Sequence, residues 1–230
     1  MEPDFSRFEK VVGYSFRDRE LLAQAFTHRS YLNEHRELTR DHNERLEFLG
    51  DAVLELAVTD HLYRAFPEAT EGDLTSYRAA LVNAITLSSV AQKLSMNDFL
   101  LLSKGESKDT GRARQFILAN TFEAFVGALY VDQGYDAARE FIAKNLFGLM
   151  DEILKNKLWL DPKSAFQEQA QERAGTTPSY QTLEETGPDH DKHFTVGVYI
   201  GSALVAKGKG KSKQEAEQDA AREGLRVKNW

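Results

Sequence analysis

The sequence contains no cysteine and has no excess of positive charge. Among its 230 residues, Lys and Arg number 29 and Asp and Glu number 36, which gives a net charge of −7. The lack of cysteine excludes disulfides, thiolate catalysis and cysteine-based zinc sites, and it is compatible with a reducing cytoplasm. Taken alone, the acidic balance argues against a nucleic-acid-binding protein, because domains of that class are typically basic.

Long apolar runs are also missing. No stretch approaches the roughly 18 uninterrupted apolar residues that a membrane-spanning helix needs, and the acidic start, Glu2 and Asp4, does not resemble a secretory signal. Hydrophobic residues make up 41% of the chain and charged residues 28%, which is typical of a globular protein. We therefore expect a cytoplasmic protein without membrane contact, with one large domain or two small ones.

Two different periodicities divide the chain. Apolar residues recur at helical spacing through residues 1–155, and Thr70 to Asp73 form a capping box that opens one of the helices. Residues 160–228 instead show a short helix, three segments of alternating apolar residues separated by turns, and a final helix. The sequence thus predicts an all-α domain (1–155) followed by a small α+β domain of order α-β-β-β-α (160–228).

Charge is distributed unevenly between these domains. Residues 160–230 contain ten Lys and Arg against eleven Asp and Glu, so they carry −1 and the preceding residues carry −6. Within the second domain, residues 204–214 hold four lysines and no acid. Glycines alternate with these lysines, and we expect them to let the backbone approach a ligand closely, before a helix N-terminus that favours anions. The stretch predicts a phosphate-binding site, with a solvated basic loop as the alternative.

Acidic residues gather on one face of a helix expected over 43–66. Glu44, Glu47 and Asp51 are spaced i, i+3 and i+7, so their side chains share that face. A solvated acidic face is the simplest explanation, but apolar neighbours flank the acids, so we expect little of this helix to face water. Gly50 in the helix interior costs about 1 kcal/mol relative to alanine, which indicates close approach by another backbone or by a ligand.

A second acidic helix supports a binding site. Glu123 lies in a mostly apolar helix expected over 113–132, and Asn120 is the polar residue one turn before it. A buried carboxylate needs a partner or a metal ion. Hard oxygen ligands without cysteine favour Mg²⁺, or Mn²⁺ as a substitute, over zinc. Together the two helices predict an oxygen-lined metal site.

Residues 43–54, NERLEFLGDAVL, resemble the signature stretch of the ribonuclease III family. Further segments agree with that family, namely FTHRSY at 26–31, EGDL at 71–74 and LANTFEA at 118–124. The resemblance covers nearly the whole chain and implies a helical endonuclease domain followed by a double-stranded-RNA-binding domain. It also implies metal-dependent hydrolysis of double-stranded RNA to 5′-phosphate and 3′-hydroxyl ends, for processing of ribosomal RNA precursors and other transcripts.

The same resemblance implies roles for individual residues. It makes Glu47, Asp51, Asn120 and Glu123 the metal-binding residues, and Asp51, Glu123, Glu47 and Glu44 the residues on which catalysis depends. Glu44 is expected outside the metal shell or on the RNA side. The family further implies a homodimer formed through the endonuclease domain, and no organic cofactor.

Asn120 departs from the family pattern, which most often has Asp at this position. Its amide oxygen can still bind a metal ion, but the lost charge weakens the affinity for divalent cations. One interpretation is a working enzyme, with or without a changed metal preference, and another is a silent double-stranded-RNA-binding protein of the same fold. A helical scaffold with incidental acids is a third, which the signature stretch disfavours. We expect retained activity, because Glu47, Asp51 and Glu123 are all present.

The resemblance to the double-stranded-RNA-binding domain implies contacts across two minor grooves and the phosphates between them. The residues at matching positions are Gln167, Glu168, His190, Lys209, Lys211 and Lys213. The first two belong to the first helix of the domain, the histidine to a loop, and the lysines to the approach and start of the final helix. Gln214 and Glu217 stand where the family often has lysine, which predicts a weaker phosphate clamp.

Overall fold

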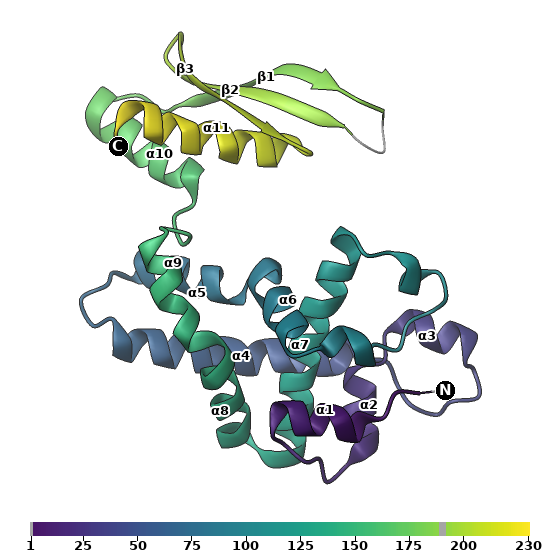
Figure 1. Ribbon diagram of the computed structural model, residues 1–230. Coiled ribbons are helices and arrows are strands. Elements are labelled where there is room, and N and C mark those ends of the chain that lie inside the picture. Colours follow the sequence, from purple (N-terminus) through teal and green to yellow (C-terminus); the bar gives the residue numbers. More distant parts are fainter. Residues whose placement is uncertain (1, 189–191) are drawn as a thin grey trace. The chain divides into compact units, whose positions relative to one another are not determined.

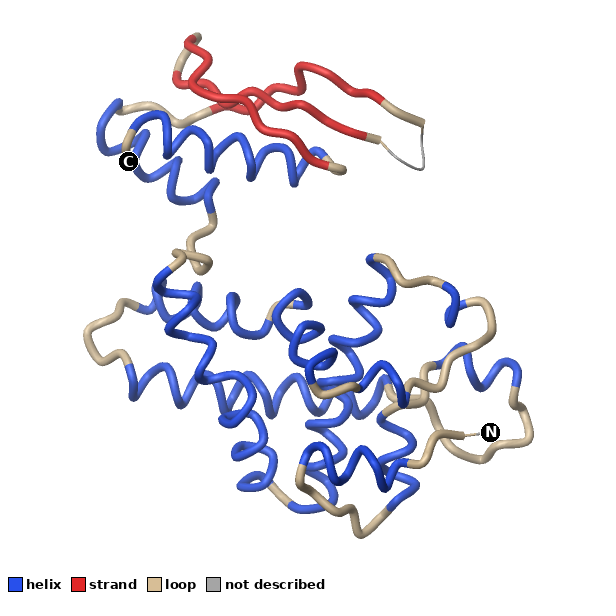
Figure 2. Tube along the Cα trace, in the orientation of Figure 1, coloured by secondary structure: helices blue, strands red, loops and turns tan. Residues whose placement is uncertain are grey.

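The computed structural model describes residues 2–188 and 192–230, and it divides into two compact units, Met1–Trp159 and Leu160–Trp230. The first unit is built from helices and the second from helices on a small sheet, as Figures 1 and 2 show. This architecture confirms the predicted fold class. No helix in the described part of the chain is both long and apolar enough to cross a membrane.

The first compact unit is called the helical unit below. Its α-helices are α1 (Phe5–Val12), α2 (Arg19–Ala25), α3 (Arg29–Glu34), α4 (Glu44–Ala65), α5 (Glu71–Val82), α6 (Ala84–Lys93), α7 (Arg112–Gln133), α8 (Tyr135–Leu146) and α9 (Met150–Lys155). Short 3₁₀ turns occur at η1 (Met96–Phe99), η2 (Glu106–Lys108) and η3 (Phe147–Leu149). The acidic residues expected at the metal site all lie on the two long helices, α4 and α7.

Local sequence signals set where these helices begin and end. The predicted capping box is confirmed at α5, where the Thr70 hydroxyl accepts the Asp73 N–H and the Asp73 carboxylate accepts the Thr70 N–H. Asn83 ends α5 and caps α6 by accepting the Thr86 N–H. Gly134 ends α7 with a φ of 89°, a backbone angle that favours glycine.

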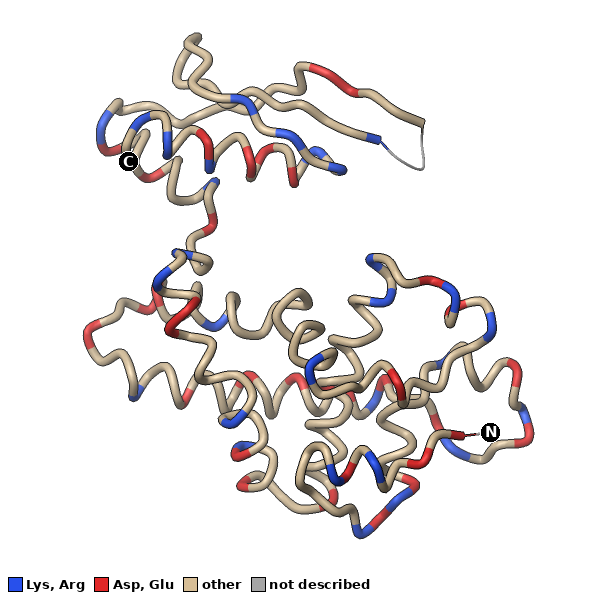
Figure 3. Tube along the Cα trace, viewed as in Figure 1, with Lys and Arg blue, Asp and Glu red and all other residues tan. Residues whose placement is uncertain are grey.

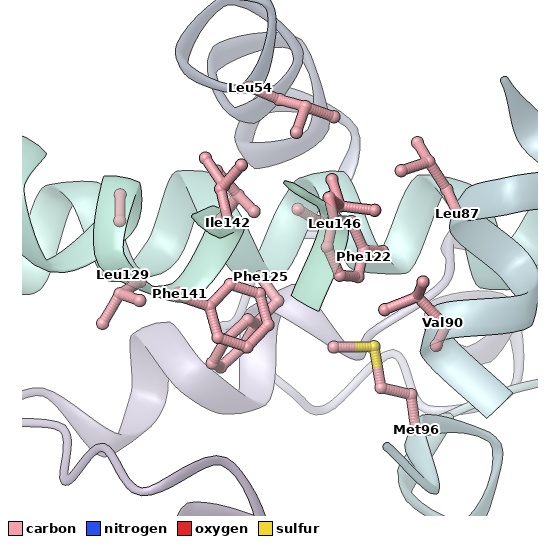
Figure 4. Packing of buried hydrophobic residues seen from close by; sticks show 14 of the residues in the cluster. Leu54, Leu87, Val90, Met96, Phe122, Phe125, Leu129, Phe141, Ile142 and Leu146 are labelled. Atoms are coloured by element: carbon pink, nitrogen blue, oxygen red, sulfur yellow. The ribbon is translucent and has the colours of Figure 1, made fainter. Parts of the chain in front are cut away.

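Helix α7 runs through the middle of the hydrophobic core. Its residues 118–129 are buried except for Asn120 and Glu123, which are partly exposed. Phe125 of α7 packs edge-on against Phe141 of α8, with ring centroids 4.9 Å apart, among the side chains drawn in Figure 4. Burying a side chain of this size contributes about 1.5 to 3 kcal/mol. The helix that carries Glu123 is therefore fixed by apolar packing on nearly all sides.

The helical unit includes the chain up to Trp159. The Trp159 ring packs edge-on against Tyr77 of α5, with ring centroids 5.0 Å apart. Ile153 of α9 is buried in the same core. These contacts anchor the last residues of the unit onto its helices.

The second compact unit, called the sheet unit below, has the predicted order of one helix, three strands and one helix. Its elements are α10 (Pro162–Ala174), β1 (Ser179–Thr186), β2 (His193–Ile200), β3 (Ala203–Gly210) and α11 (Lys213–Lys228). The strands form an antiparallel sheet in the order β1-β2-β3, and both helices cover one face of it (Figure 1). The core between sheet and helices includes Phe166, Val196 and Ala220. Trp230 packs against Phe166 with ring centroids 5.4 Å apart.

The glycines of β3 face helix α11. A Cβ atom on Gly208 would lie 2.0 Å from the backbone nitrogen of Ala220, and one on Gly210 would lie 2.6 Å from that of Ala216. Because side chains alternate across a strand, Lys209 between them projects from the opposite face. The expectation that these glycines admit a ligand is therefore wrong, since the space that they leave is filled by the helix.

Candidate active site

Two glycines bring helices α4 and α7 into backbone contact. A Cβ atom on Gly50 would lie 1.8 Å from the carbonyl oxygen of Glu123, and one on Gly127 would lie 2.2 Å from that of Leu46. Only glycine lets two helices approach this closely. The predicted close approach at Gly50 is thus confirmed, and its partner is another backbone. The contact brings the acidic face of α4 up to the one acidic residue in the buried stretch of α7.

Glu123 lies partly buried at this crossing. Burial, followed by the carboxylates of Asp51, Glu47 and Glu55, raises the pKa of Glu123 to about 8. Burial and the three carboxylates all disfavour the charged form of Glu123. Among the described residues, no cationic side chain contributes to this shift. A carboxylate in these surroundings either keeps its proton or is neutralised by a bound cation.

Glu47 lies one helical turn before Asp51 and is also partly buried. Burial and the carboxylate of Glu44 raise the pKa of Glu47, a hydrogen bond from Asn120 lowers it, and the Asp51 carboxylate raises it further. Asn120 therefore directs its amide at Glu47 across the helix crossing. The NH₂ group is the donor in this hydrogen bond, and the amide oxygen is the atom with which Asn120 can bind a metal ion.

The donor atoms at the crossing suit a hard divalent cation. Glu47, Asp51 and Glu123 offer carboxylate oxygens and Asn120 offers an amide oxygen, which are the ligands that Mg²⁺ and Mn²⁺ prefer. In the part of the chain that the structure describes, no three Asp, Glu or His side chains converge tightly on one point. Burial first, and then the neighbouring carboxylates, raise the pKa of Glu123, so a bound cation would relieve the repulsion between these groups. The donor chemistry at the crossing therefore fits a divalent cation.

Glu44, the first acid of the signature stretch, has different partners. Its carboxylate lies 3.4 Å from the Arg29 guanidinium and 3.8 Å from Nδ1 of His42. Its side chain is 47% exposed, whereas Glu47 and Glu123 are partly buried at the crossing. A role outside the metal shell, as the sequence suggested, remains a prediction.

Another face of α4 exposes apolar side chains. Phe48 is 82% exposed, and Leu56 and Tyr63 are exposed as well. The expectation that little of this helix faces water is therefore wrong. A hollow of about 620 Å³ lies beside Phe48, and its apolar wall includes Leu46 and Val131. Exposed apolar surface of this kind is typical of a contact with another protein chain.

The residues expected to contact RNA lie on several elements of the sheet unit. Gln167 and Glu168 are exposed on α10, and Lys213 is the first residue of α11. Lys209 is exposed in β3, and Lys211 is exposed in the short connection between β3 and α11. Figure 3 shows basic residues concentrated along β3 and at the start of α11.

Backbone hydrogen bonds fix the lysine-rich segment against α11. The Lys209 N–H donates to the Asp219 carboxylate at 2.9 Å, and the Lys211 N–H donates to the Glu215 carboxylate at 2.9 Å. Two acids of α11 thus order the backbone from which the lysine side chains extend. His190, the other predicted contact, lies outside the described residues.

Glu217, which stands where lysine is frequent, has a partner inside the sheet unit. Its carboxylate lies 2.7 Å from Nζ of Lys163, and this ammonium group lies 4.9 Å from the centre of the Tyr180 ring. The ion pair joins the start of α10 to α11. An acid at this position is therefore explained by a contact between the two helices.

Comparisons with known proteins agree with this geometry. A family model described as Ribonuclease-III-like matches residues 18–150, and the model of the double-stranded RNA binding motif matches residues 162–228. The chain is 47% identical over 214 residues to a ribonuclease 3 of Pelotomaculum thermopropionicum, which covers 93% of this chain and 89% of that protein. The chain belongs to the ribonuclease III family.

A ribonuclease 3 of Carboxydothermus hydrogenoformans is 48% identical over 95% of this chain and 93% of that protein. Among solved structures, the nuclease domain of ribonuclease III from Campylobacter jejuni has a TM-score of 0.56 and 38% identity, over 62% of this chain and 98% of that one.

Membership of the ribonuclease III family decides between the interpretations of the sequence. The protein is an endoribonuclease, a hydrolase that acts on double-stranded RNA, and the family implies that it depends on a divalent metal ion. The alternative of a silent RNA-binding protein is not favoured. The argument from the net charge of −7 against a nucleic-acid partner is wrong, because that charge is concentrated in the helical unit while lysines gather in the sheet unit.

Two charged residues near the site were not singled out from the sequence. Glu55 contributes to the raised pKa of Glu123 and lies four residues after Asp51, so helical spacing was sufficient to find it. Arg29 pairs with Glu44 but lies on a different helix. No local pattern connects these two residues, and their contact depends on the tertiary fold.

Proposed function

We propose that this ribonuclease III-family enzyme uses Mg²⁺, held by Glu47, Asp51, Asn120 and Glu123, to hydrolyse RNA phosphodiester bonds to 5′-phosphate and 3′-hydroxyl ends. The observation that carries the proposal is the group of carboxylates at the α4–α7 crossing, where burial and like charges raise the pKa of Glu123 to about 8. Neighbouring carboxylates that repel one another suit a multiply charged cation. Bound Mg²⁺, or Mn²⁺ in its place, would supply charge neutralisation at the scissile phosphate and an activated water molecule.

The protein side chains hold and orient the reacting groups. The backbone contact at Gly50 and Gly127 fixes α4 against α7, so the acids keep their spacing as RNA arrives. Glu44 lies outside the metal shell, on the RNA side. No protein nucleophile is needed, because the attacking group is water.

The sheet unit would hold the duplex by its shape. Gln167, Glu168 and His190 would enter minor grooves, and Lys209, Lys211 and Lys213 would contact phosphates. The proposed substrates are therefore duplex segments of ribosomal RNA precursors and other transcripts. Because these RNAs are cellular, we propose a cytoplasmic location.

Cleavage of long duplex RNA tests this assignment of the site. We expect Glu123→Gln and Asp51→Asn to lower the cleavage rate about 1,000-fold or more, since each removes a charge that holds the cation. Glu140→Gln, on an exposed position of α8, is the matched control and should cleave normally. EDTA should stop the wild-type reaction and Mg²⁺ should restore it. Normal cleavage by Glu123→Gln would reject the proposed site.

We also propose that two copies of the chain associate through the helical unit, so that two sites act on one duplex. The support is the exposed Phe48 beside a hollow of about 620 Å³, since a two-fold axis would let the Phe48 of each copy enter the hollow of the other. The nuclease domain of the Campylobacter jejuni enzyme contains a region involved in dimer formation in that protein.

Sedimentation velocity tests the dimer. Phe48→Asp should convert the protein to a monomer, because the charge would be buried at the contact. Val227→Asp introduces the same charge at an exposed apolar residue of the sheet unit and should leave the dimer intact. A wild-type protein that sediments as a monomer at all accessible concentrations would contradict the proposal.

A further inference from the structure

Arg29 projects from a backbone that is tied down on both sides. The His28 N–H donates to the Leu101 carbonyl at 3.0 Å, and the Ser103 N–H donates to the Ser30 hydroxyl at 3.1 Å. The His28 ring and the Ser30 hydroxyl are themselves hydrogen-bonded at 2.8 Å. The residues before and after Arg29 are thus both attached to the segment that follows η1.

The same backbone is joined to the start of α4. The Asn43 N–H donates to the Thr27 carbonyl at 2.9 Å, and the Asn43 side-chain amide donates to the Ala25 carbonyl at 3.2 Å. Thr27 and Asn43 are both buried. Buried hydrogen bonds therefore fix the position of Arg29 relative to the helix that carries Glu44.

The ion pair with Glu44 does not by itself account for this ordering. The Arg29 side chain is 69% exposed and approaches Glu44 through Nη1, at 3.4 Å. An ion pair this exposed contributes little to stability. A side chain this exposed leaves much of the guanidinium open to another partner, and its planar fork of N–H donors matches a phosphate group.

The position of the pair points to the identity of that partner. Glu44 lies one helical turn, about 4.5 Å along the axis, before Glu47, so Arg29 stands at the edge of the proposed metal-binding group. We propose that Arg29 binds a phosphate of the RNA strand next to the scissile phosphate, with Glu44 holding the guanidinium in place before RNA arrives. The inference rests on the proposed function, which puts the scissile phosphate at Glu47, Asp51 and Glu123.

The salt dependence of RNA binding tests the inference. Equilibrium binding of a uniform RNA duplex would be measured with full-length Glu123→Gln protein in EDTA over a range of salt concentrations, with and without a second substitution at Arg29. Arg29→Ala should reduce the slope of log K against log salt by about 0.9, the loss of one phosphate contact. Arg29→Lys keeps the charge and should retain the slope.

Arg64 of α4 supplies a matched control. Its side chain is 73% exposed and pairs with Asp60 at 2.8 Å, yet it lies at the other end of α4 from Glu44. Arg64→Ala should leave the salt slope unchanged. A slope unaltered by Arg29→Ala would overturn the inference, and so would a reduced slope accompanied by a lower melting temperature that Arg29→Lys does not restore.

The proposed function is tested independently of the salt slope measured for Arg29→Ala. It is judged by cleavage of duplex RNA by the wild-type protein in Mg²⁺ and by the effect of Glu123→Gln on that cleavage. Wild-type cleavage that depends on Glu123, together with an unaltered slope for Arg29→Ala, would reject the role of Arg29 and leave the metal site in place. Normal cleavage by Glu123→Gln would reject the metal site, whatever the slope.

Discussion

The helical unit and the sheet unit both use paired glycines to place charge, with opposite results. Gly50 and Gly127 let two helices touch, and that contact gathers acids around a partly buried crossing. Gly208 and Gly210 let β3 lie against α11, and the alternation along the strand sends Lys209 to the exposed face. Like charges gathered at a partly buried site favour a counter-ion, whereas like charges spread along a surface are screened by water and salt.

Gly50→Ala would disrupt the glycine contact of the helical unit, and we expect it to have the largest effect of the changes considered. The added Cβ would lie 1.8 Å from the Glu123 carbonyl oxygen, so α4 and α7 must separate. We expect the helical unit to lose about 3 kcal/mol or more of unfolding free energy and the enzyme to lose cleavage. Calorimetry and a cleavage assay measure the two effects. Gly148→Ala is the control, since a Cβ there meets nothing within 4 Å, and an equal loss in that variant would contradict the explanation.

Gly208→Ala is the corresponding change in the sheet unit. Its Cβ would lie 2.0 Å from the Ala220 nitrogen, and we expect a loss of about 2 to 3 kcal/mol in that unit, with weaker duplex binding. The melting of the helical unit should not change. Lys209→Ala, on the opposite face of the strand, should melt normally and lower only the salt slope of binding. If both variants destabilised the sheet unit equally, the two-face description of β3 would be wrong.

The pH dependence of stability distinguishes the crowded carboxylates at the α4–α7 crossing from the exposed, screened lysines of the sheet unit. The folded protein raises the pKa of Glu123 from 4.5 to about 8, so its contribution to stability is full below pH 4.5 and is lost as the pH rises to about 8. Glu123→Gln removes this loss. In EDTA we expect the variant to become more stable than wild type by about 2 kcal/mol above pH 8, with no such gain at pH 4.5. Thermal melting across this range measures the difference, and a difference independent of pH would refute it.

Asn120→Asp adds one more acid to the α4–α7 crossing and so increases the difference in charge crowding between the two units. We expect it to have the smallest effect on stability and cleavage. The hydrogen bond that Asn120 donates to Glu47 would be replaced by repulsion, so the metal-free protein should melt at a lower temperature. The added charge should lower the Mg²⁺ concentration for half-maximal cleavage, by about tenfold if the gain is about 1.4 kcal/mol. Superimposable Mg²⁺ titrations of the two proteins would show that position 120 does not contribute to metal binding.

The sequence was sufficient where the deciding forces are local. The capping box at Thr70, the helical character of the first unit and the order of elements in the sheet unit follow from short patterns, and the cost of glycine in a helix correctly indicated a close contact at Gly50. The resemblance to the ribonuclease III family correctly indicated the fold and the activity. The assignment of individual site residues stays a prediction.

The sequence was insufficient where the deciding contact joins distant segments. Glycine is unfavourable in strands, so the lysine–glycine alternation did not look like β3, and the helix that fills the space beside Gly208 lies later in the chain. The exposure of Phe48 was missed because helical periodicity cannot distinguish a residue buried in its own core from one left for a second chain. The pairing of Arg29 with Glu44 depends on buried hydrogen bonds between the segments that lead into α3 and α4.

The aromatic contacts at the end of each unit have a practical consequence for spectroscopy. The chain has two tryptophans, and one lies in each unit, Trp159 against Tyr77 and Trp230 against Phe166. Replacing either tryptophan by phenylalanine leaves tryptophan fluorescence, selected by excitation at the red edge of the absorption band, that comes from the other unit alone. The unfolding of the helical unit and of the sheet unit, with or without Mg²⁺ and RNA, can therefore each be followed by the emission of its own tryptophan.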